Sequence, residues 1–320
     1  MGAQLRDYRR RIRSVQSTRK ITKAMELIAA SRIVKAQARM TAARPYAEEL
    51  TRALSAVLQD SSLTHPMLTG VDEPRRAGIL LITSDRGLAG GYNANAIRAA
   101  NDLAARLERD GREVVRYVIG RKGAAYYNFR RVPLSGTWTG FSEQPAFLDI
   151  REATEVIEAA LSATSADTVG GDGPQGLDEL YIVYTQFKNS VSQVPVTQLL
   201  SPVKDVVAES DSDSAEGEPE AGADGSDEVS YEFEPEPEEL IAALLPRYIS
   251  ARIFSALLES AASESAARRR AMKSASDNAN ELIRTYTRLA NQARQAEITQ
   301  EISEIVGGAD ALAAAGSEEG

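Results

Sequence analysis

Two long segments, one at each end of the chain, contain neither glycine nor proline. They are residues 3–44 and 247–306 of a chain of 320 residues. Segments of this length without a helix breaker predict long helices. Around the second segment, sixteen positions alternately three and four residues apart run from Leu244 to Ala296, and thirteen of them are apolar. Sustained over so many heptads, this pattern predicts a coiled coil rather than an ordinary globular helix.

The first helix is predicted to continue past Pro45, with a kink there, to about Leu58. Both helices join the middle of the chain from the same side, so they are expected to run antiparallel. At about 1.5 Å per residue they are roughly 85 Å and 100 Å long, and the C-terminal helix should extend beyond the N-terminal one. The expected seam of the first helix consists of apolar residues near a 3.5-residue spacing: Leu5, Tyr8, Ile12, Val15, Ile21, Met25 and Ile28.

The middle of the chain has a different pattern. Apolar runs at Ala77–Thr83, Glu113–Ile119 and Glu179–Thr185 predict buried strands, and helical stretches lie between them at 93–109 and 146–161. This alternation indicates a parallel, Rossmann-like α/β sheet. The fold class is therefore α/β, with a long antiparallel two-helix coiled coil. The expected divisions are 1–58, 59–207, an acidic insert and foot segment at 208–239, 240–306, and a C-terminal tip at 307–320.

Charge is distributed in blocks. The chain has 46 acidic and 37 basic side chains, a formal charge of −9. Residues 208–239 hold 14 acidic and no basic side chains, so the rest of the chain carries 37 basic against 32 acidic. Residues 1–44 hold 12 basic and two acidic side chains. The sequence thus predicts a basic first helix and an acidic insert, of which residues 209–228 have the composition of a disordered segment.

The composition argues against most recognisable active sites. There is no cysteine and only one histidine, which excludes disulfides, thiolate nucleophiles and Cys-based metal sites, so no cofactor or metal is expected. No window approaches 18 apolar residues, so no membrane span is expected. The N-terminus lacks the apolar core of a secretory signal and the features of a transit peptide.

Three blocks of sequence resemble one family. Ser14–Gln37 (SVQSTRKITKAMELIAASRIVKAQ), Thr83–Asn93 (TSDRGLAGGYN) and Ile298–Ala311 (ITQEISEIVGGADA), the last preceded by NQARQAE, are similar to blocks of the gamma subunit of bacterial F-type ATP synthase, the central rotor stalk. The resemblance covers nearly the whole chain. It implies a non-catalytic shaft that couples rotation of a membrane c ring to conformational cycling of the catalytic beta subunits, and that regulates ATPase activity and proton flow.

The resemblance also implies contacts. Three alpha and three beta subunits would surround the coiled coil, and the α/β domain would stand on the c ring beside epsilon. The complex would sit on the cytoplasmic face of the cell membrane, which this chain meets only through the c ring. Beta-subunit contacts would be made by Lys20, Lys23, Met25, Arg294, Gln295, Thr299 and Glu301. Contacts with the c ring or epsilon would be made by Tyr231, Phe233 and Glu234.

Other readings of the same sequence are open. Ser84–Gly91 follows a strand and precedes a helix, as a phosphate-binding loop does, although it fits neither GxGxxG nor GxxxxGK[ST]. The alternative function is therefore a nucleotide-binding α/β enzyme with a coiled-coil dimerisation arm. A plain coiled-coil scaffold is a third reading, and it leaves the polar block Arg294–Glu301 without a role. Nucleic acid is not an expected partner, because the arginines at positions 6–13 cover most of the helix circumference and the one aromatic residue among them, Tyr8, belongs to the expected seam.

Overall fold

The computed structural model describes residues 2–60, 66–71, 73–163, 176–203 and 237–317. The chain divides into two compact units. Residues 1–28 and 269–320 form the first, and residues 29–268 form the second. Two long helices contribute to both: α1 covers Gly2–Asp60 with Pro45 inside it, and α7 covers Pro237–Ser317. The expected insert at 209–228, the loop around 165–175 and the foot residues Tyr231, Phe233 and Glu234 lie outside the described residues.

The first unit is an antiparallel helix pair. The Thr22 and Ser276 hydroxyls are 2.7 Å apart, and Arg19 Nη1 donates to Asn280 Oδ1 at 3.0 Å. Nearer the N-terminus, the Tyr8 and Tyr286 ring centroids lie 6.4 Å apart. Residue numbers fall along α7 as they rise along α1, which confirms the antiparallel prediction.

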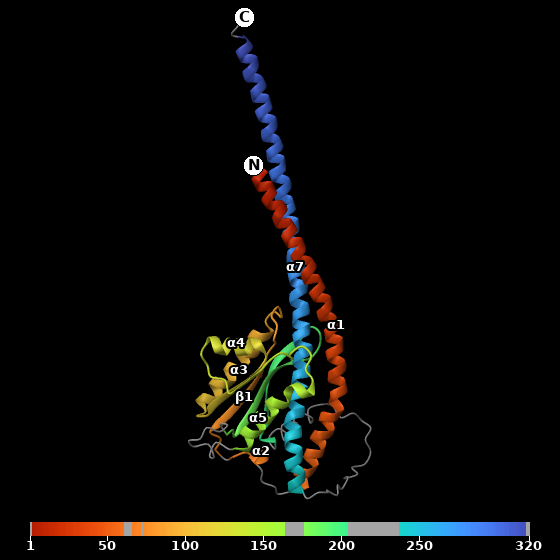
Figure 1. Cartoon of the computed structure of the whole chain (residues 1–320), viewed down its shortest axis with the longest axis vertical. Coiled ribbons are helices and arrows are strands. Elements are labelled where there is room, and N and C mark those ends of the chain that lie inside the picture. Colours follow the sequence, from red (N-terminus) through yellow and green to blue (C-terminus); the bar gives the residue numbers. More distant parts are fainter. Residues whose placement is uncertain (1, 61–65, 72, 164–175, 204–236, 318–320) are drawn as a thin grey trace, which may run out of the picture. The chain divides into compact units, whose positions relative to one another are not determined.

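The register of this pair leaves the end of α7 without α1 beside it. The two numbers of each facing pair add to between 294 and 299, so the first residues of α1 face positions near 295 on α7. The last twenty or so residues of α7 therefore have no α1 partner, a length of about 30 Å. Figure 1 shows the C-terminus of α7 well beyond the N-terminus of α1. The predicted extension is confirmed, and α7 continues helically to Ser317, past the expected end at 306.

The seam of α1 differs from the expected one at two of its seven residues, while Leu5, Tyr8, Ile12, Val15 and Met25 are half-buried. Ile21 and Ile28 are 58% and 53% exposed, and the neighbouring Thr22 and Ala29 are buried. At these two places the buried position is shifted by one residue, because small side chains allow a closer approach of two helices than isoleucines do. Apolar spacing alone therefore placed this part of the seam one residue off. As a result, two isoleucines on this helix face outward.

The second unit contains a five-stranded sheet in the order β3-β2-β1-β4-β5. The strands are β1 Arg76–Ile82, β2 Glu113–Ile119, β3 Gly136–Trp138, β4 Glu179–Phe187 and β5 Gln193–Ser201. The helices are α2 Pro66–Thr69, α3 Tyr92–Arg109, α4 Arg121–Phe129, the 3-10 turn η1 Phe147–Ile150, and α5 Arg151–Ser162. The first four strands in this order are parallel, and β5 is antiparallel to β4.

Helices cover both faces of the sheet (Figure 1). On one face, α3 and α4 bury alternate strand residues such as Ile79, Leu81 and Val183. On the other face, α5 and α7 pack with the end of α1 over the opposite residues, among them Leu80 and Ile82. Because successive strand side chains point to opposite faces, runs such as ILLI are apolar throughout. The α/β prediction is confirmed.

Three elements differ from the expectation. β3, α4 and the antiparallel β5 were not expected, and the predicted sheet was parallel throughout. β3 has only three residues, and α4 contains a glycine (Gly123), so neither gives a strong periodic signal. β5 contains Pro195 and is half-exposed over most of its length, which is typical of an edge strand.

One stretch of α7 is long and apolar enough to cross a membrane by length and composition alone. The expectation of no such window does not hold by this measure. Residues from this part of α7, including Ile241, Leu245, Ile249 and Ile253, belong to the sheet's hydrophobic core. A helix that supplies a core in this way has the same composition, so the observation is weak evidence for a span.

Candidate functional site

The first predicted contact group lies on α1 in the first unit. Lys20 and Lys23 are exposed and Met25 is half-buried. Lys23 Nζ is 3.0 Å from Glu26 Oε2, a helix-surface pair whose lysine remains largely in solvent. Such a pair contributes only about 0.3–0.5 kcal/mol, so the lysine can exchange its partner at little cost. Exposed Ile21 adds apolar surface next to these cations.

The second predicted group lies on the C-terminal part of α7. Its four members, Arg294, Gln295, Thr299 and Glu301, are all exposed. Thr299 Oγ1 donates to the Gln295 carbonyl at 2.9 Å, which leaves the hydroxyl lone pairs as acceptors. Arg294 and Glu301 are seven residues apart and therefore share one side of the helix. Neither forms a salt bridge with another described residue, so both can pair with groups from outside the chain.

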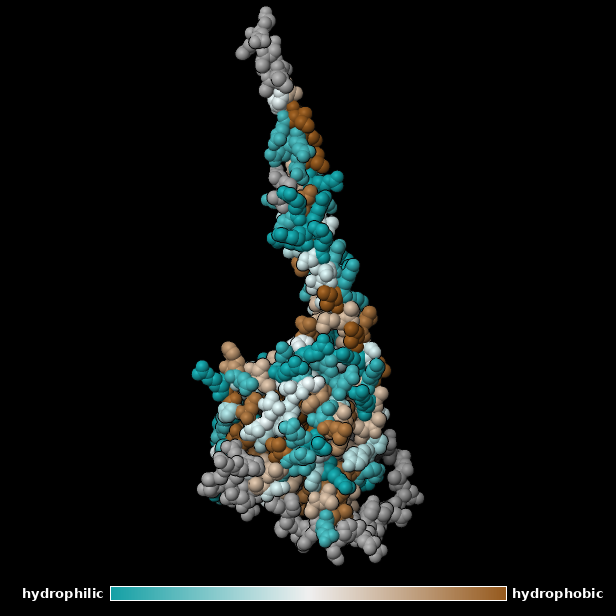
Figure 2. Space-filling view, viewed as in Figure 1, coloured by the Kyte–Doolittle hydropathy of each residue, from teal (hydrophilic) through white to brown (hydrophobic). Residues whose placement is uncertain are grey.

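An apolar stripe accompanies the second group. Ile298, Ile302, Ile305 and Val306 are between 45% and 72% exposed. Their spacing of four, three and one residues places them along one side of α7, and Figure 2 shows apolar side chains gathered along one side near this end. A single helix with large aliphatic side chains in water is unfavourable, so this end of α7 has the character of an interface.

The structure keeps the two groups apart. Residues 20–25 of α1 face α7 near residues 273–279, whereas the second group begins at Arg294. At about 1.5 Å per residue the groups are roughly 30 Å apart along the pair. They cannot form one binding site. They are two separate polar faces on the same helical pair.

The crevice of the sheet, where an α/β protein would bind a nucleotide, lies at the carboxyl ends of β1 and β4. In this chain α7 runs across it. The Tyr92 hydroxyl donates to the Ser260 carbonyl at 3.4 Å, and the Thr185 amide donates to Ser260 Oγ at 3.4 Å. Nine consecutive α7 residues, 260–268, are buried here. The crevice is occupied by the protein itself.

The loop Ser84–Gly91 also has the wrong polarity for phosphate. Arg268 donates to the carbonyl oxygens of Arg86 and Gly87 at 3.2–3.3 Å. The nearby amides of Ser84 and Asp85 are already bonded to Asn93 Oδ1 and Ser142 Oγ. A phosphate site needs free amides that point at the ligand. A loop that offers carbonyls binds a cation, and here the cation is an arginine of the same chain, which argues against the nucleotide-binding alternative.

Arg268 is the buried centre of an ionic cluster that reaches the surface at Arg86. Arg268 Nη2 is 2.7 Å from Glu264 Oε1, and Arg268 Nη1 is 3.2 Å from Glu143 Oε1. Glu143 also pairs with Arg32 and, at 3.6 Å, with Arg86. We call these five residues the arginine clasp. Burial raises the pKa of the Glu264 carboxyl, and the charge of Arg268 partly opposes this shift.

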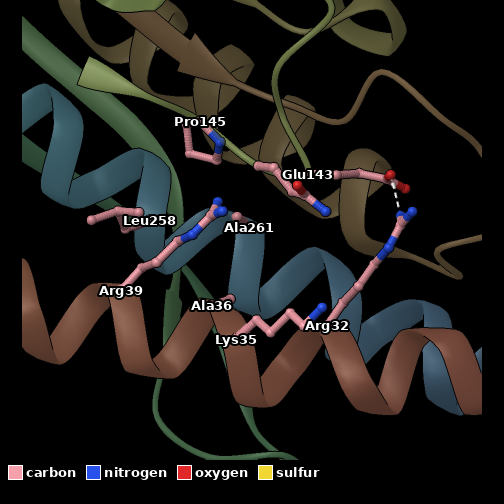
Figure 3. A pocket seen from close by; sticks show the side chains of 9 residues that line it. Arg32, Lys35, Ala36, Arg39, Glu143, Pro145, Leu258 and Ala261 are labelled. Atoms are coloured by element: carbon pink, nitrogen blue, oxygen red, sulfur yellow. Dashed lines mark hydrogen bonds and ion pairs between the residues drawn. The ribbon is translucent and has the colours of Figure 1, made fainter. Parts of the chain in front are cut away.

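The sequence expectation missed the clasp, although it contained a signal. Arg268 and Ser265 were two of the three polar exceptions in the apolar seam, and both are buried. A polar residue at a seam position points to a polar partner inside the structure. The small cavity next to the clasp, about 20 Å³, holds about one water and no larger ligand. Figure 3 shows it between α1, α7 and the loop at Glu143.

The chain matches the family model described as ATP synthase over residues 4–312. It is 55% identical over 321 residues to the ATP synthase gamma chain of Salinispora tropica, covering 99% of this chain and all of the relative. It is 56% identical over 318 residues to that of Acidothermus cellulolyticus, with 99% and 100% coverage. A chain of the mitochondrial ATP synthase of Euglena gracilis has a similar fold, with a TM-score of 0.61, 17% identity, and coverage of 98% and 95%.

Helices from both chain ends that pair antiparallel, joined by an α/β domain whose crevice is occupied by one of them, define a class of α/β protein with a coiled-coil arm. Full-length matches above 50% identity make the assignment specific: the chain belongs to the family of ATP synthase gamma chains. It functions as a non-catalytic stalk subunit of the enzyme complex. As such it is a peripheral part of a membrane-bound assembly.

Proposed function

We propose that the helical pair is the central shaft of a rotary ATP synthase and that its two polar faces contact beta subunits at two levels. The observation that supports this most directly is the end of α7. It has no α1 beside it, and its exposed stripe from Ile298 to Val306 accompanies Arg294 and Glu301, which lack ion-pair partners among the described residues. A helix end of this kind is suited to a sleeve formed by other subunits, here three alpha and three beta.

The two groups suit different contacts. Lys20 and Lys23 are long, exposed cations that attract acidic surfaces at a distance and tolerate sliding. Arg294 can hold a carboxylate through two parallel bonds, a more specific contact. An off-centre shaft with such contacts has a different interaction energy with each of three equivalent sites, and rotation therefore changes which site is favoured. In this way rotation is coupled to ATP synthesis or hydrolysis without any residue of this chain touching the nucleotide.

We also propose contact with the c ring and the epsilon subunit through Tyr231, Phe233 and Glu234, which lie outside the described residues. The chain would lie on the cytoplasmic face of a bacterial membrane, coupled to proton flow. The basis is the similarity to actinobacterial gamma chains and the alternation of aromatic and acidic residues in this segment.

The proposed contact between Arg294 and a beta subunit is tested with Arg294→Ala in the reconstituted complex. Removing a charge-assisted contact of about 1.5–3 kcal/mol should lower ATP hydrolysis roughly tenfold or more, provided that the contact forms during the rate-limiting step. Arg288→Ala, which removes another exposed arginine of α7, is the matched control and should retain full activity. Equal activity of the two variants would remove Arg294 from the proposed contact.

The role as a shaft is tested by the subunit composition of the purified complex. Purification of the complex through a tag on this chain should give one copy for three alpha and three beta subunits. A two-fold symmetric homodimer free of these subunits would contradict the proposal.

A further inference from the structure

The loop that carries Glu143 is held in place by hydrogen bonds. Glu143 follows β3, in a segment fastened to the loop after β1. Asp85 Oδ2 accepts hydrogen bonds from the amides of Gly140 at 2.8 Å and Ser142 at 3.0 Å, and the Asp85 amide donates to Ser142 Oγ at 2.9 Å. Three bonds to one residue leave the segment little freedom. The Glu143 carboxylate is therefore presented from a rigid part of the α/β domain.

From this position Glu143 contacts both long helices. Its Oε2 accepts from Arg32 of α1, and its Oε1 lies 3.2 Å from Arg268 of α7. Figure 3 shows the Glu143 side chain directed toward α1, where it meets Arg32. Its side chain is only 15% exposed, and that of Arg268 only 6%. One carboxylate thus links two helices whose residues are more than a hundred positions apart in sequence.

The helix surfaces around this link have little shape of their own. Residues 260–268 of α7 are all alanine or serine except Glu264 and Arg268. The adjacent apolar cluster contains Ala36, Ala262 and Ala266 together with the larger Ile33 and Phe187. The small side chains of α7 pack closely but form shallow knobs, so they resist rotation of the helix about its own axis weakly. Ionic contacts add to that resistance at this level.

The resistance can be estimated from geometry. The tip of a side chain lies about 6 Å from a helix axis, so a rotation of about 10° moves it by about 1 Å. A movement of that size would lengthen the 3.2 Å contact between Arg268 and Glu143 beyond the range of an ion pair. The contact therefore fixes the angular setting of α7 to within a few degrees.

The clasp also has a particular place in the chain. Arg268 is the last residue of the second unit, and Arg32 is the fourth residue after the unit's other boundary. Both helices therefore make their ionic contact with the α/β domain close to where they leave it. A force applied to the domain therefore reaches the helices at this level as well as through the core that they share with the sheet.

We infer that Glu143 is a positioning residue for energy coupling, which fixes the rotational setting of α1 and α7 against the α/β domain. The inference depends on the proposed function as a shaft. The Glu143 carboxylate contacts arginines of the same chain, Arg32, Arg86 and Arg268. Its effect is on how much of a rotation imposed on the domain reaches the helices.

The test uses the complete complex carrying Glu143→Gln. Glutamine keeps the shape of the side chain but removes its charge and one of its two acceptor oxygens, so the ion pairs with Arg32 and Arg268 are weakened and the clasp's contribution to the torsional stiffness between domain and shaft should fall about twofold. Angular fluctuations of a probe on the α/β domain of a stalled single complex measure that stiffness, and their variance should rise. Proton pumping per ATP hydrolysed should fall in membrane vesicles, with ATP hydrolysis itself little changed.

Glu152→Gln, an exposed glutamate on α5, is the matched control and should change neither quantity. An assembled Glu143→Gln complex with normal stiffness and normal pumping per ATP would overturn the inference. If that variant does not assemble, Arg32→Gln takes its place, because it removes only the ion pair between α1 and Glu143. Stiffness and pumping per ATP are then read in the same way. Failure of the wild-type chain to copurify with alpha and beta subunits would instead refute the shaft proposal and leave the clasp as a structural fact.

Discussion

The arginine clasp makes a quantitative prediction for stability. The side chains of Arg268 and Glu264 are only 6% and 1% exposed, and their closest atoms are 2.7 Å apart. Arg268→Met removes the cation and leaves the Glu264 carboxylate buried without a partner. Breaking a buried ion pair from one side costs about 3–5 kcal/mol, because the remaining charge has lost both water and its counter-ion. We expect a loss of this size.

Removing both charges should cost much less. In Arg268→Met with Glu264→Leu, no charge remains unpaired between these two residues, and apolar replacement of a buried pair is often nearly neutral. The double variant should therefore recover most of the stability lost in the single one. The carbonyl groups of Arg86 and Gly87 lose a donor in both variants, so recovery should not be complete.

The loss should also depend on pH. Burial raises the pKa of Glu264 above its unfolded value, and removal of Arg268 should raise it further. An acid with a raised pKa in the folded state favours folding at low pH, and this contribution is lost as the pH rises through the folded-state pKa. The Arg268→Met variant should therefore be closest to wild type near pH 5 and furthest from it near pH 8.

The assay uses the only tryptophan of the chain, Trp138. It lies buried in β3, stacked on Tyr117 with centroids 6.3 Å apart, so its fluorescence reports on the α/β unit. With an m-value of about 3 kcal/mol/M, the urea midpoint of the single variant should fall by about 1–1.7 M. Equal losses in the single and double variants, or a loss that is the same at both pH values, would refute the reasoning.

Two further predictions concern the backbone at Gly120 and the seam between α1 and α7. Gly120 has φ +105°, and a Cβ there would lie 2.2 Å from the Thr83 carbonyl oxygen. Gly120→Ala should therefore destabilise the α/β unit by several kcal/mol, measured as a lower urea midpoint by Trp138 fluorescence; a midpoint equal to wild type would contradict this. Thr22→Val buries a methyl group opposite the Ser276 hydroxyl and leaves that hydroxyl without its 2.7 Å partner. The first unit should lose about 1–3 kcal/mol of stability, seen by circular dichroism as helix melting at lower temperature. Thr18→Val, at an exposed site, is the control.

The long elements were predictable because their signals are repeated many times. Sixteen seam positions indicated α7, and runs such as Ile79–Ile82 indicated strands buried on both faces. The antiparallel pairing followed from connectivity. The exact seam of α1 could not be predicted in the same way. Either Ile21 or Thr22 can occupy the buried position, and which one does depends on how closely the partner helix approaches. Sequence spacing contains no information about that distance.

The role of Glu143 in the clasp could not be predicted from the sequence, for another reason. Glu143 meets Arg32 and Arg268 across more than a hundred positions on each side. Nothing local distinguishes this glutamate from exposed ones such as Glu152. Only the fold, which brings the loops after β1 and β3 beside both helices, gives the residue its setting.

The shared core on the α5 side of the sheet has a consequence for synthesis. It is built from the end of α1, the strands, and α7 residues 241–257. A ribosome makes these in order, so the apolar side chains of Leu80, Ile82 and Ile182 emerge long before the helix that covers them. This face of the nascent domain stays open to water, or to a chaperone, until the last quarter of the chain is made. Folding of the α/β domain is in this sense completed late in synthesis, by the same helix that fills its crevice.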